Sequence, residues 1–85
     1  MARYRLLFKK SVAKDLRAIP KKDVQQILKR IKALADAPRP DGCEKLTDQE
    51  RYRIRQYSYR VIYEVKDDVL IIIVVKIAHR SEAYR

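Results

Sequence analysis

The feature that most constrains the fold is a series of three strand-like segments in the second half of the chain, separated by very short connections. The segments cover residues 52–56, 59–65 and 69–77, and the first two alternate between apolar and polar side chains. Two residues separate the first pair and three separate the second pair. A parallel strand pair needs a crossover of a dozen or more residues. The sequence therefore predicts a three-stranded antiparallel meander.

The first half of the chain predicts one short strand and two helices. Residues 3–8 suit a strand, Ser11 is the expected N-cap of a helix over 12–19, and Pro20 ends that helix. A second helix carries one apolar stripe at helical spacing, formed by Val24, Ile27, Leu28, Ile31, Leu34 and Ala35. The expected fold is a single α+β domain over residues 1–85, in the order β-α-α-β-β-β. It has a small antiparallel-rich sheet with the N-terminal helical hairpin packed on one face.

The last segment, 69–77, is apolar at nearly every position. A strand that is apolar on both faces is typical of the middle of a sheet covered on both sides. We therefore expect this strand to be central and covered.

A two-residue turn at Tyr57-Ser58 would fix the pairing of the first hairpin. Gln56 then faces Tyr59, and Arg55 faces Arg60. Since side chains alternate between faces, one face would carry tyrosines and aliphatic residues and pack on the helices. The other face would carry three arginines together, namely Arg53, Arg55 and Arg60.

Like charges directly across a strand pair destabilise it, so stability alone does not favour Arg55 opposite Arg60. The whole chain has 21 Lys and Arg against 11 Asp and Glu, a net charge of +10. Such a charge favours a polyanionic partner, and the planar arginine fork suits phosphate. The alternative is a solvated polar face with scattered arginines. We favour the polyanion site.

Several classes of site and location are excluded or disfavoured. Cys43 is the single cysteine, so no disulfide forms within the chain, and one cysteine with one histidine does not make a structural zinc site. No carboxylate cluster suits magnesium, and no cofactor is expected. The longest apolar run is too short to cross a membrane. Without an apolar signal segment, the expected location is the cytoplasm.

An ordered series of short segments resembles the RelE toxins of the RelE/ParE superfamily. The segments are KLT at 45–47, YRIR at 52–55, YRVIY at 59–63, VKIAHR at 75–80 and EAY at 82–84. The resemblance covers the whole chain. It implies a ribosome-dependent, metal-independent endoribonuclease that cleaves messenger RNA in the A site by attack of a 2′-hydroxyl on the adjacent phosphate. It also implies a neutralising, acidic, RelB-like antitoxin as partner, besides the ribosome with its bound messenger RNA.

The resemblance also implies roles for individual residues. The basic pair of the family falls on Arg53 and Arg55, and its two later arginines fall on Arg60 and Arg80. The tyrosine near the C-terminus falls on Tyr84. In one branch a glutamate is the general base, and Glu44 stands at about that place. Further RNA contacts are predicted at Lys45, Tyr57 and His79.

The sequence departs from the family in ways that keep alternatives open. Well-studied members have lysines where this chain has Arg53 and Arg55, and an arginine does not give up its proton at neutral pH. Many relatives have glycine in the hairpin turn, where this chain has Tyr57-Ser58. One alternative is a gyrase-inhibiting toxin of the ParE branch. The other is an RNA-binding relic without activity.

Overall fold

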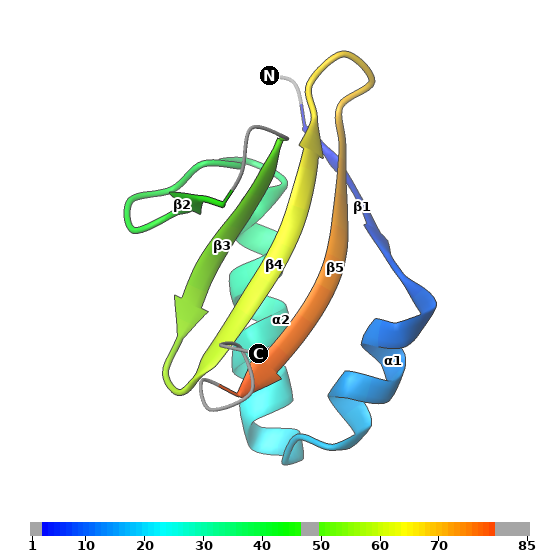
Figure 1. Ribbon diagram of the computed structural model, residues 1–85, viewed down its shortest axis with the longest axis vertical. Helices are drawn as coiled ribbons and strands as arrows, with labels where there is room; N and C mark the ends of the chain where they lie inside the picture. Colours follow the sequence, from blue (N-terminus) through cyan, green and yellow to red (C-terminus); the bar gives the residue numbers. More distant parts are fainter. Residues whose placement is uncertain (1–2, 47–49, 80–85) are drawn as a thin grey trace.

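The sheet is built around the predicted meander and gains one strand on either side. The structure, a computed structural model, describes residues 3–46 and 50–79. Its elements are β1 (Arg5–Phe8), α1 (Lys10–Arg17), α2 (Lys21–Leu34), β2 (Glu44–Lys45), β3 (Arg51–Gln56), β4 (Tyr59–Lys66) and β5 (Ile71–His79). The strand order is β1-β5-β4-β3-β2 (Figure 1). β1 runs parallel to β5, whereas the other pairs are antiparallel. The predicted α+β class is confirmed, and the two-residue strand β2 was not predicted.

The β3–β4 hairpin has the predicted register. Gln56 pairs with Tyr59, Arg55 with Arg60, and Tyr52 with Tyr63. The next strand begins later than expected, because the turn extends over 67–70 and Leu70 adopts a φ of 54°. The predicted start at residue 69 was therefore wrong by two residues.

An irregularity between β4 and β5 changes which way the end of β5 faces. Ile62 pairs with Lys76 but Tyr63 pairs with Val74, so Val75 is an extra residue on β5. Such a bulge reverses the alternation of side chains beyond it. Both Val74 and Ile77 are therefore buried on the helix side.

Both predicted helices form, but the first spans Lys10–Arg17 instead of 12–19, and its expected cap is wrong. α1 begins at Lys10 with Lys9 as the N-cap, so Ser11 lies inside the first turn, and no side chain caps this end. Pro20 is the N-cap of α2. Its fixed φ suits the start of a helix as well as the end of the preceding one.

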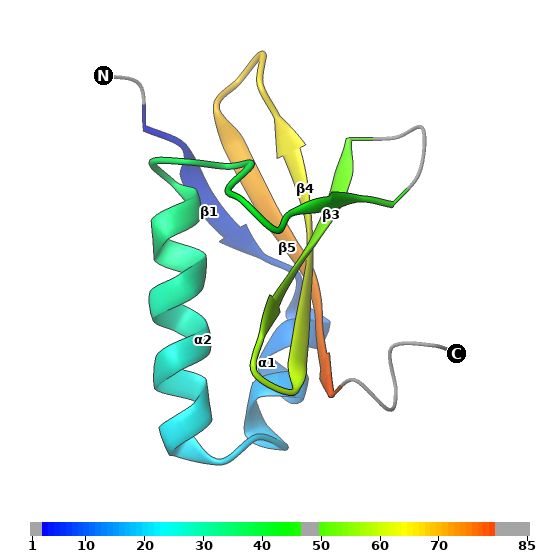
Figure 2. The ribbon, with the colours of Figure 1, turned by 90° about the vertical axis from the view of Figure 1, so that its left-hand side faces the viewer.

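The core lies between α2 and one face of the sheet, as Figure 2 shows. From α2, Ile27, Ile31 and Leu34 are fully buried, as the apolar stripe predicts. They meet buried strand residues, which are Tyr52, Ile54, Val61, Tyr63, Val65, Ile72, Val74 and Ile77. Fully burying one such aliphatic side chain contributes about 1.5–3 kcal/mol.

β5 is an interior strand, flanked by β1 and β4, but helices of the described residues cover only one of its faces. Ile71 and Ile73, which face away from the helices, are half-buried. The expectation of cover on both faces was wrong for this part of the chain, because both helices contribute to the same side. No helix within residues 3–46 and 50–79 is long and apolar enough to cross a membrane.

α1 contacts the edge of β5 beyond the point where the pairing with β1 ends. The pairing with β1 ends at Val74, while β5 continues to His79. Beyond that point Asp15 of α1 provides a hydrogen-bond acceptor for the strand. Its Oδ2 accepts a hydrogen bond from the backbone N–H of Ile77 at 3.2 Å. A helix side chain thus satisfies a strand donor that β1 does not reach.

Candidate nucleic-acid interface

The sheet face away from α2 carries a row of arginines, which we call the arginine face. It contains Arg51, Arg53 and Arg55 from β3 and Arg60 from β4. Arg55 lies directly opposite Arg60, and Arg53 lies opposite Ile62 on the next pair along the same face. This is the arrangement that the two-residue turn predicts. Like charges therefore face each other across the hairpin.

The three arginines of the predicted site differ in how far they reach into solvent. Arg60 is buried, with 6% of its surface exposed. The side chain of Arg53 is 18% exposed and that of Arg55 is 56% exposed. Arg55 is thus the guanidinium best placed to meet a phosphate from solution, while the others lie deeper beside it.

Glu44 bridges two of these arginines. The short edge strand β2 pairs with β3 so that Glu44 lies opposite Arg53. Its Oε2 accepts a hydrogen bond from Arg53 Nη2 at 2.5 Å, and its Oε1 lies 3.7 Å from Arg55 Nη2. The structure therefore places the candidate general base against both arginines.

The fourth arginine of this face is already neutralised. Arg51 Nη2 donates to Glu64 Oε2 at 2.5 Å, and this bond holds the pKa of Glu64 below its usual value. Arg53 and Arg55 both contact one carboxylate, that of Glu44. Three arginines, Arg53, Arg55 and Arg60, thus gather at the hairpin end of the arginine face.

Two predicted RNA contacts lie on the opposite face of the sheet. Lys45 pairs in register with Tyr52, so it points to the helix side, where its Nζ lies 3.5 Å from Glu50. His79 likewise follows Tyr59, and their rings meet edge to face at 5.6 Å. The bulge at Val75 explains the position of His79, because it reverses the alternation of side chains four residues earlier. The structure separates both residues from the arginine face.

The remaining predicted residues are the hairpin tip and the C-terminal pair. Tyr57 is 78% exposed at the tip of the β3–β4 hairpin, directly beyond the Arg55–Arg60 pair. Arg80 and Tyr84 lie outside the described residues. Their predicted roles remain predictions.

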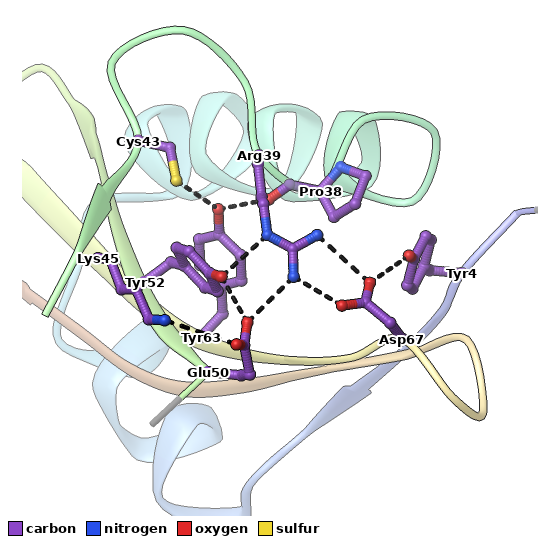
Figure 3. A network of polar contacts seen from close by, with 9 residues as sticks. All are labelled: Tyr4, Pro38, Arg39, Cys43, Lys45, Glu50, Tyr52, Tyr63 and Asp67. Carbon is purple, nitrogen blue, oxygen red and sulfur yellow. Dashed lines mark hydrogen bonds and ion pairs between the residues drawn. The ribbon is translucent and has the colours of Figure 1, made fainter. Parts of the chain in front are cut away.

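Sequence reasoning missed a polar network centred on Arg39, shown in Figure 3. Arg39 donates to the Tyr52 hydroxyl at 2.9 Å, to Glu50 at 3.1 Å and to Asp67 at 2.8 Å. Tyr4 donates to Asp67 at 2.6 Å. No local pattern indicates these contacts, since the partners come from four separate parts of the sequence.

The network shifts the pKa values of its acids. Hydrogen bonds from Arg39 and then Tyr4 lower the pKa of Asp67. Hydrogen bonds from Tyr52 and then Arg39 lower the pKa of Glu50. The bond to Asp67 raises the pKa of Arg39. Because Tyr52 belongs to the helix side of β3, the network lies apart from the arginine face, and we assign it a structural role.

The described residues offer no obvious cation site. No group of three or more His, Cys, Asp or Glu side chains lies close enough to hold a metal ion within 3–46 and 50–79. The arginine face offers guanidinium groups and the carboxylates of Glu44 and Glu64.

Comparison with known proteins identifies the class to which this fold belongs. A RelE-like toxin protein of Escherichia coli is 28% identical over 83 residues, which cover 95% of this chain and 87% of that protein. The RelE toxin in the archaeal RelE–RelB complex from Pyrococcus horikoshii is 30% identical, with a TM-score of 0.81 over 96% of this chain and 99% of that one. Isolated E. coli RelE is 25% identical, with a TM-score of 0.80 over 95% and 90% of the two chains.

The fold is thus that of the RelE/ParE superfamily of toxins. The sequence model of one family, described as the ParE toxin of the type II toxin–antitoxin system parDE, matches residues 6–84. The chain belongs to this superfamily and is a toxin of a type II toxin–antitoxin system.

Proposed function

We propose that this toxin is an endoribonuclease that cleaves messenger RNA in the A site of the ribosome. The observation that carries the proposal is the pairing of Arg55 with Arg60 on the sheet face away from α2, with Arg53 on the next pair. The pairing favours a polyanion, because facing like charges do not serve stability. Its nearness to a carboxylate, Glu44, favours chemistry on the RNA over binding alone.

The proposed reaction uses the RNA's own nucleophile. The 2′-oxygen of one nucleotide bonds to the adjacent phosphorus, the bond from phosphorus to the 5′-oxygen breaks, and a cyclic phosphate and a 5′-hydroxyl result. Negative charge grows on the non-bridging oxygens during attack. Fixed guanidinium groups stabilise that charge, and such stabilisation is often the largest contribution to catalysis. We assign this role to Arg55 with Arg53 and Arg60.

The proton from the 2′-hydroxyl needs an acceptor. Arginine does not serve, since it keeps its proton at neutral pH. Glu44 is the carboxylate that the described residues bring into contact with Arg53 and Arg55, so we assign it as general base. A proton must also reach the leaving 5′-oxygen, and Tyr84 remains the predicted donor.

We expect the ribosome to supply the orientation of the RNA strand that this site lacks. A face with strong cations and few acid–base groups should act slowly on free RNA, because the strand is not held in line for attack. Positioning a reactant in the right geometry contributes about 7–11 kcal/mol in favourable cases. The proposal therefore places the toxin in the cytoplasm, on ribosomes that carry messenger RNA.

The proposed protein partner is an acidic, RelB-like antitoxin. The P. horikoshii relative was solved as a complex of RelE with RelB. A chain with a net charge of +10 attracts an acidic partner over a wide surface. Such an antitoxin would inhibit the toxin by covering the arginine face.

Gyrase inhibition is the second candidate function, because the matching family model is described as ParE. A gyrase inhibitor would bind a complex of protein and DNA and would cut no RNA. The cluster of Arg53, Arg55 and Arg60 with Glu44 favours the nuclease.

Single-turnover cleavage of messenger RNA on programmed ribosomes tests the proposal. Arg55→Thr should lower the cleavage rate roughly 10²–10³-fold, the usual loss for one charge-stabilising group. Its stability should change by less than about 1 kcal/mol, since losing the exposed pair with Glu44 and losing the facing like charge are small and opposite effects. Added antitoxin should abolish cleavage.

Arg51→Thr is the matched control, because it is the same change on the same strand and face at an arginine already paired with Glu64. It should retain cleavage close to that of the unmodified toxin. Gyrase inhibition by the unmodified toxin without cleavage would overturn the nuclease proposal. Equal losses in both variants would show a general charge effect rather than a site.

A further inference from the structure

The tip of the β3–β4 hairpin combines an aromatic side chain with an unfavourable backbone conformation. Tyr57 has a φ of 55°, in the left-handed region that bulky residues rarely adopt. Glycine would adopt it without steric conflict. Strain of this kind persists where the surrounding structure enforces it, and it is often found at binding and catalytic sites.

The ring of Tyr57 contributes little to the fold. It is 78% exposed, and it belongs neither to the buried core nor to the partly buried residues that pack against it. The other tyrosines of the hairpin, Tyr52, Tyr59 and Tyr63, each form a hydrogen bond through the hydroxyl with a residue from a distant part of the sequence. Contacts within the fold therefore account for those three tyrosines, but no such contact among the described residues accounts for a tyrosine at position 57.

Tyr57 lies in the turn directly after the arginines of β3, a strand that ends at Gln56. Arg53 and Arg55 stand two residues apart on one face, at a spacing of about 6.6 Å for an extended strand. Tyr57 follows after two more residues, just beyond the Arg55–Arg60 pair. Cations that follow the backbone of a single strand, with an aromatic ring on which a base stacks, are the usual means of binding single-stranded RNA.

We propose that Tyr57 is a stacking platform for one nucleobase of the single-stranded RNA held by Arg53 and Arg55, and that its strained conformation is retained for this purpose. The inference rests on the proposed function and adds to it a residue that positions the substrate. Stacking needs only the aromatic ring, so it tolerates loss of the hydroxyl. It also needs an unpaired base, so it gives no benefit with duplex RNA.

The test separates the ring from the backbone strain. Tyr57→Gly removes both, Tyr57→Asn removes the ring at a residue type that tolerates positive φ, and Tyr57→Phe keeps the ring. The matched control is Leu70→Gly, because Leu70 has nearly the same φ, 54°, in the turn at the other end of β4. Thermal unfolding should show Tm rising by roughly 3 °C in both glycine variants, as strain is released in a domain of this size.

Binding is measured by fluorescence anisotropy with a short single-stranded RNA in which 2′-O-methyl groups block cleavage. Tyr57→Gly and Tyr57→Asn should bind roughly tenfold more weakly, the loss expected for one stacked base. Tyr57→Phe and Leu70→Gly should bind like the unmodified toxin. The same sequence as a duplex should bind all five proteins alike.

The outcomes distinguish this inference from the proposed function. Tyr57-dependent RNA binding by a toxin that cleaves nothing on ribosomes would overturn the nuclease proposal and retain the stacking role. Cleavage with full RNA affinity in Tyr57→Gly would overturn the stacking role alone. Weaker antitoxin binding with unchanged RNA binding would also overturn it, and would assign Tyr57 to the protein partner. A fall in Tm for Tyr57→Gly but not Leu70→Gly would show that the ring serves the fold.

Discussion

At the scale of single residues, Glu44 has two effects on the arginine face that oppose each other. Its carboxylate offsets part of the repulsion between Arg55 and Arg60, because it contacts Arg55 at 3.7 Å as well as Arg53 at 2.5 Å. The same carboxylate competes with an RNA phosphate for those guanidinium groups. A residue that weakens substrate binding is retained more readily when it also takes part in the reaction.

The role of Glu44 can be tested by removing its charge and keeping its shape. Glu44→Gln should lower the single-turnover cleavage rate by roughly 10²–10⁴-fold, the usual contribution of a general base. RNA affinity should stay equal or increase, since two guanidinium groups lose a competing anion. Cleavage rate and affinity are measured on programmed ribosomes over a range of toxin concentrations.

Glu64→Gln is the matched control, because Glu64 pairs with Arg51 on the same face of the sheet at the same distance of 2.5 Å. It should cleave at a normal rate. If Glu44→Gln also cleaves normally, Glu44 holds the arginines in place and another group accepts the proton.

At the scale of elements, strand pairings that follow from short connections can be predicted from the sequence. Features that depend on contacts with distant parts of the chain cannot. The two-residue turn at Tyr57-Ser58 leaves one register for the hairpin, so the pairing of Arg55 with Arg60 was predictable. β2 has only two residues, too few to show the alternation of apolar and polar side chains that indicates a strand. The bulge at Val75 cannot be recognised from the sequence, because it lies in an apolar run. It places His79 on the sheet face opposite the arginines.

The contact between α1 and the end of β5 gives an element-scale prediction. Asp15→Ala should destabilise the fold by about 1–2 kcal/mol, because the N–H of Ile77 loses its acceptor in a partly buried position. Asp15→Asn should lose less, since its amide oxygen still accepts this hydrogen bond. Urea unfolding of the three proteins gives the free energies. If the alanine and asparagine variants are equally stable, the hydrogen bond to Ile77 contributes nothing.

At the scale of the whole molecule, positive charge is in excess, and two of the acids link distant parts of the chain. The Arg39 network joins Tyr4 near β1, the segment after α2, the start of β3 and the turn before β5. Four distant parts of the chain thus depend on two carboxylates, Glu50 and Asp67. A small domain with a limited core relies more on such contacts than a large one.

This dependence predicts that the toxin loses stability in acid. The pKa values of Asp67, Glu50 and Glu64 are all lower in the folded protein than their ordinary values, which lie near 4. The unfolded chain therefore binds more protons as the pH falls through this range. The stability that these acids contribute is fully present above about pH 5 and is lost progressively as the pH falls through their lowered folded-state values.

Tm measured between about pH 7 and pH 2 checks the sign and the source of this effect. Asp67→Asn should lower Tm at neutral pH and make the decline in acid shallower, because one of the protons that favours unfolding is no longer taken up. Glu50 and Glu64 remain, so part of the decline should persist. Asp68→Asn, a change of the neighbouring exposed residue in the same turn, should leave the profile as it is. An unchanged profile in Asp67→Asn, or equal effects of the two changes, would show that the network on Arg39 does not set the acid stability of the toxin.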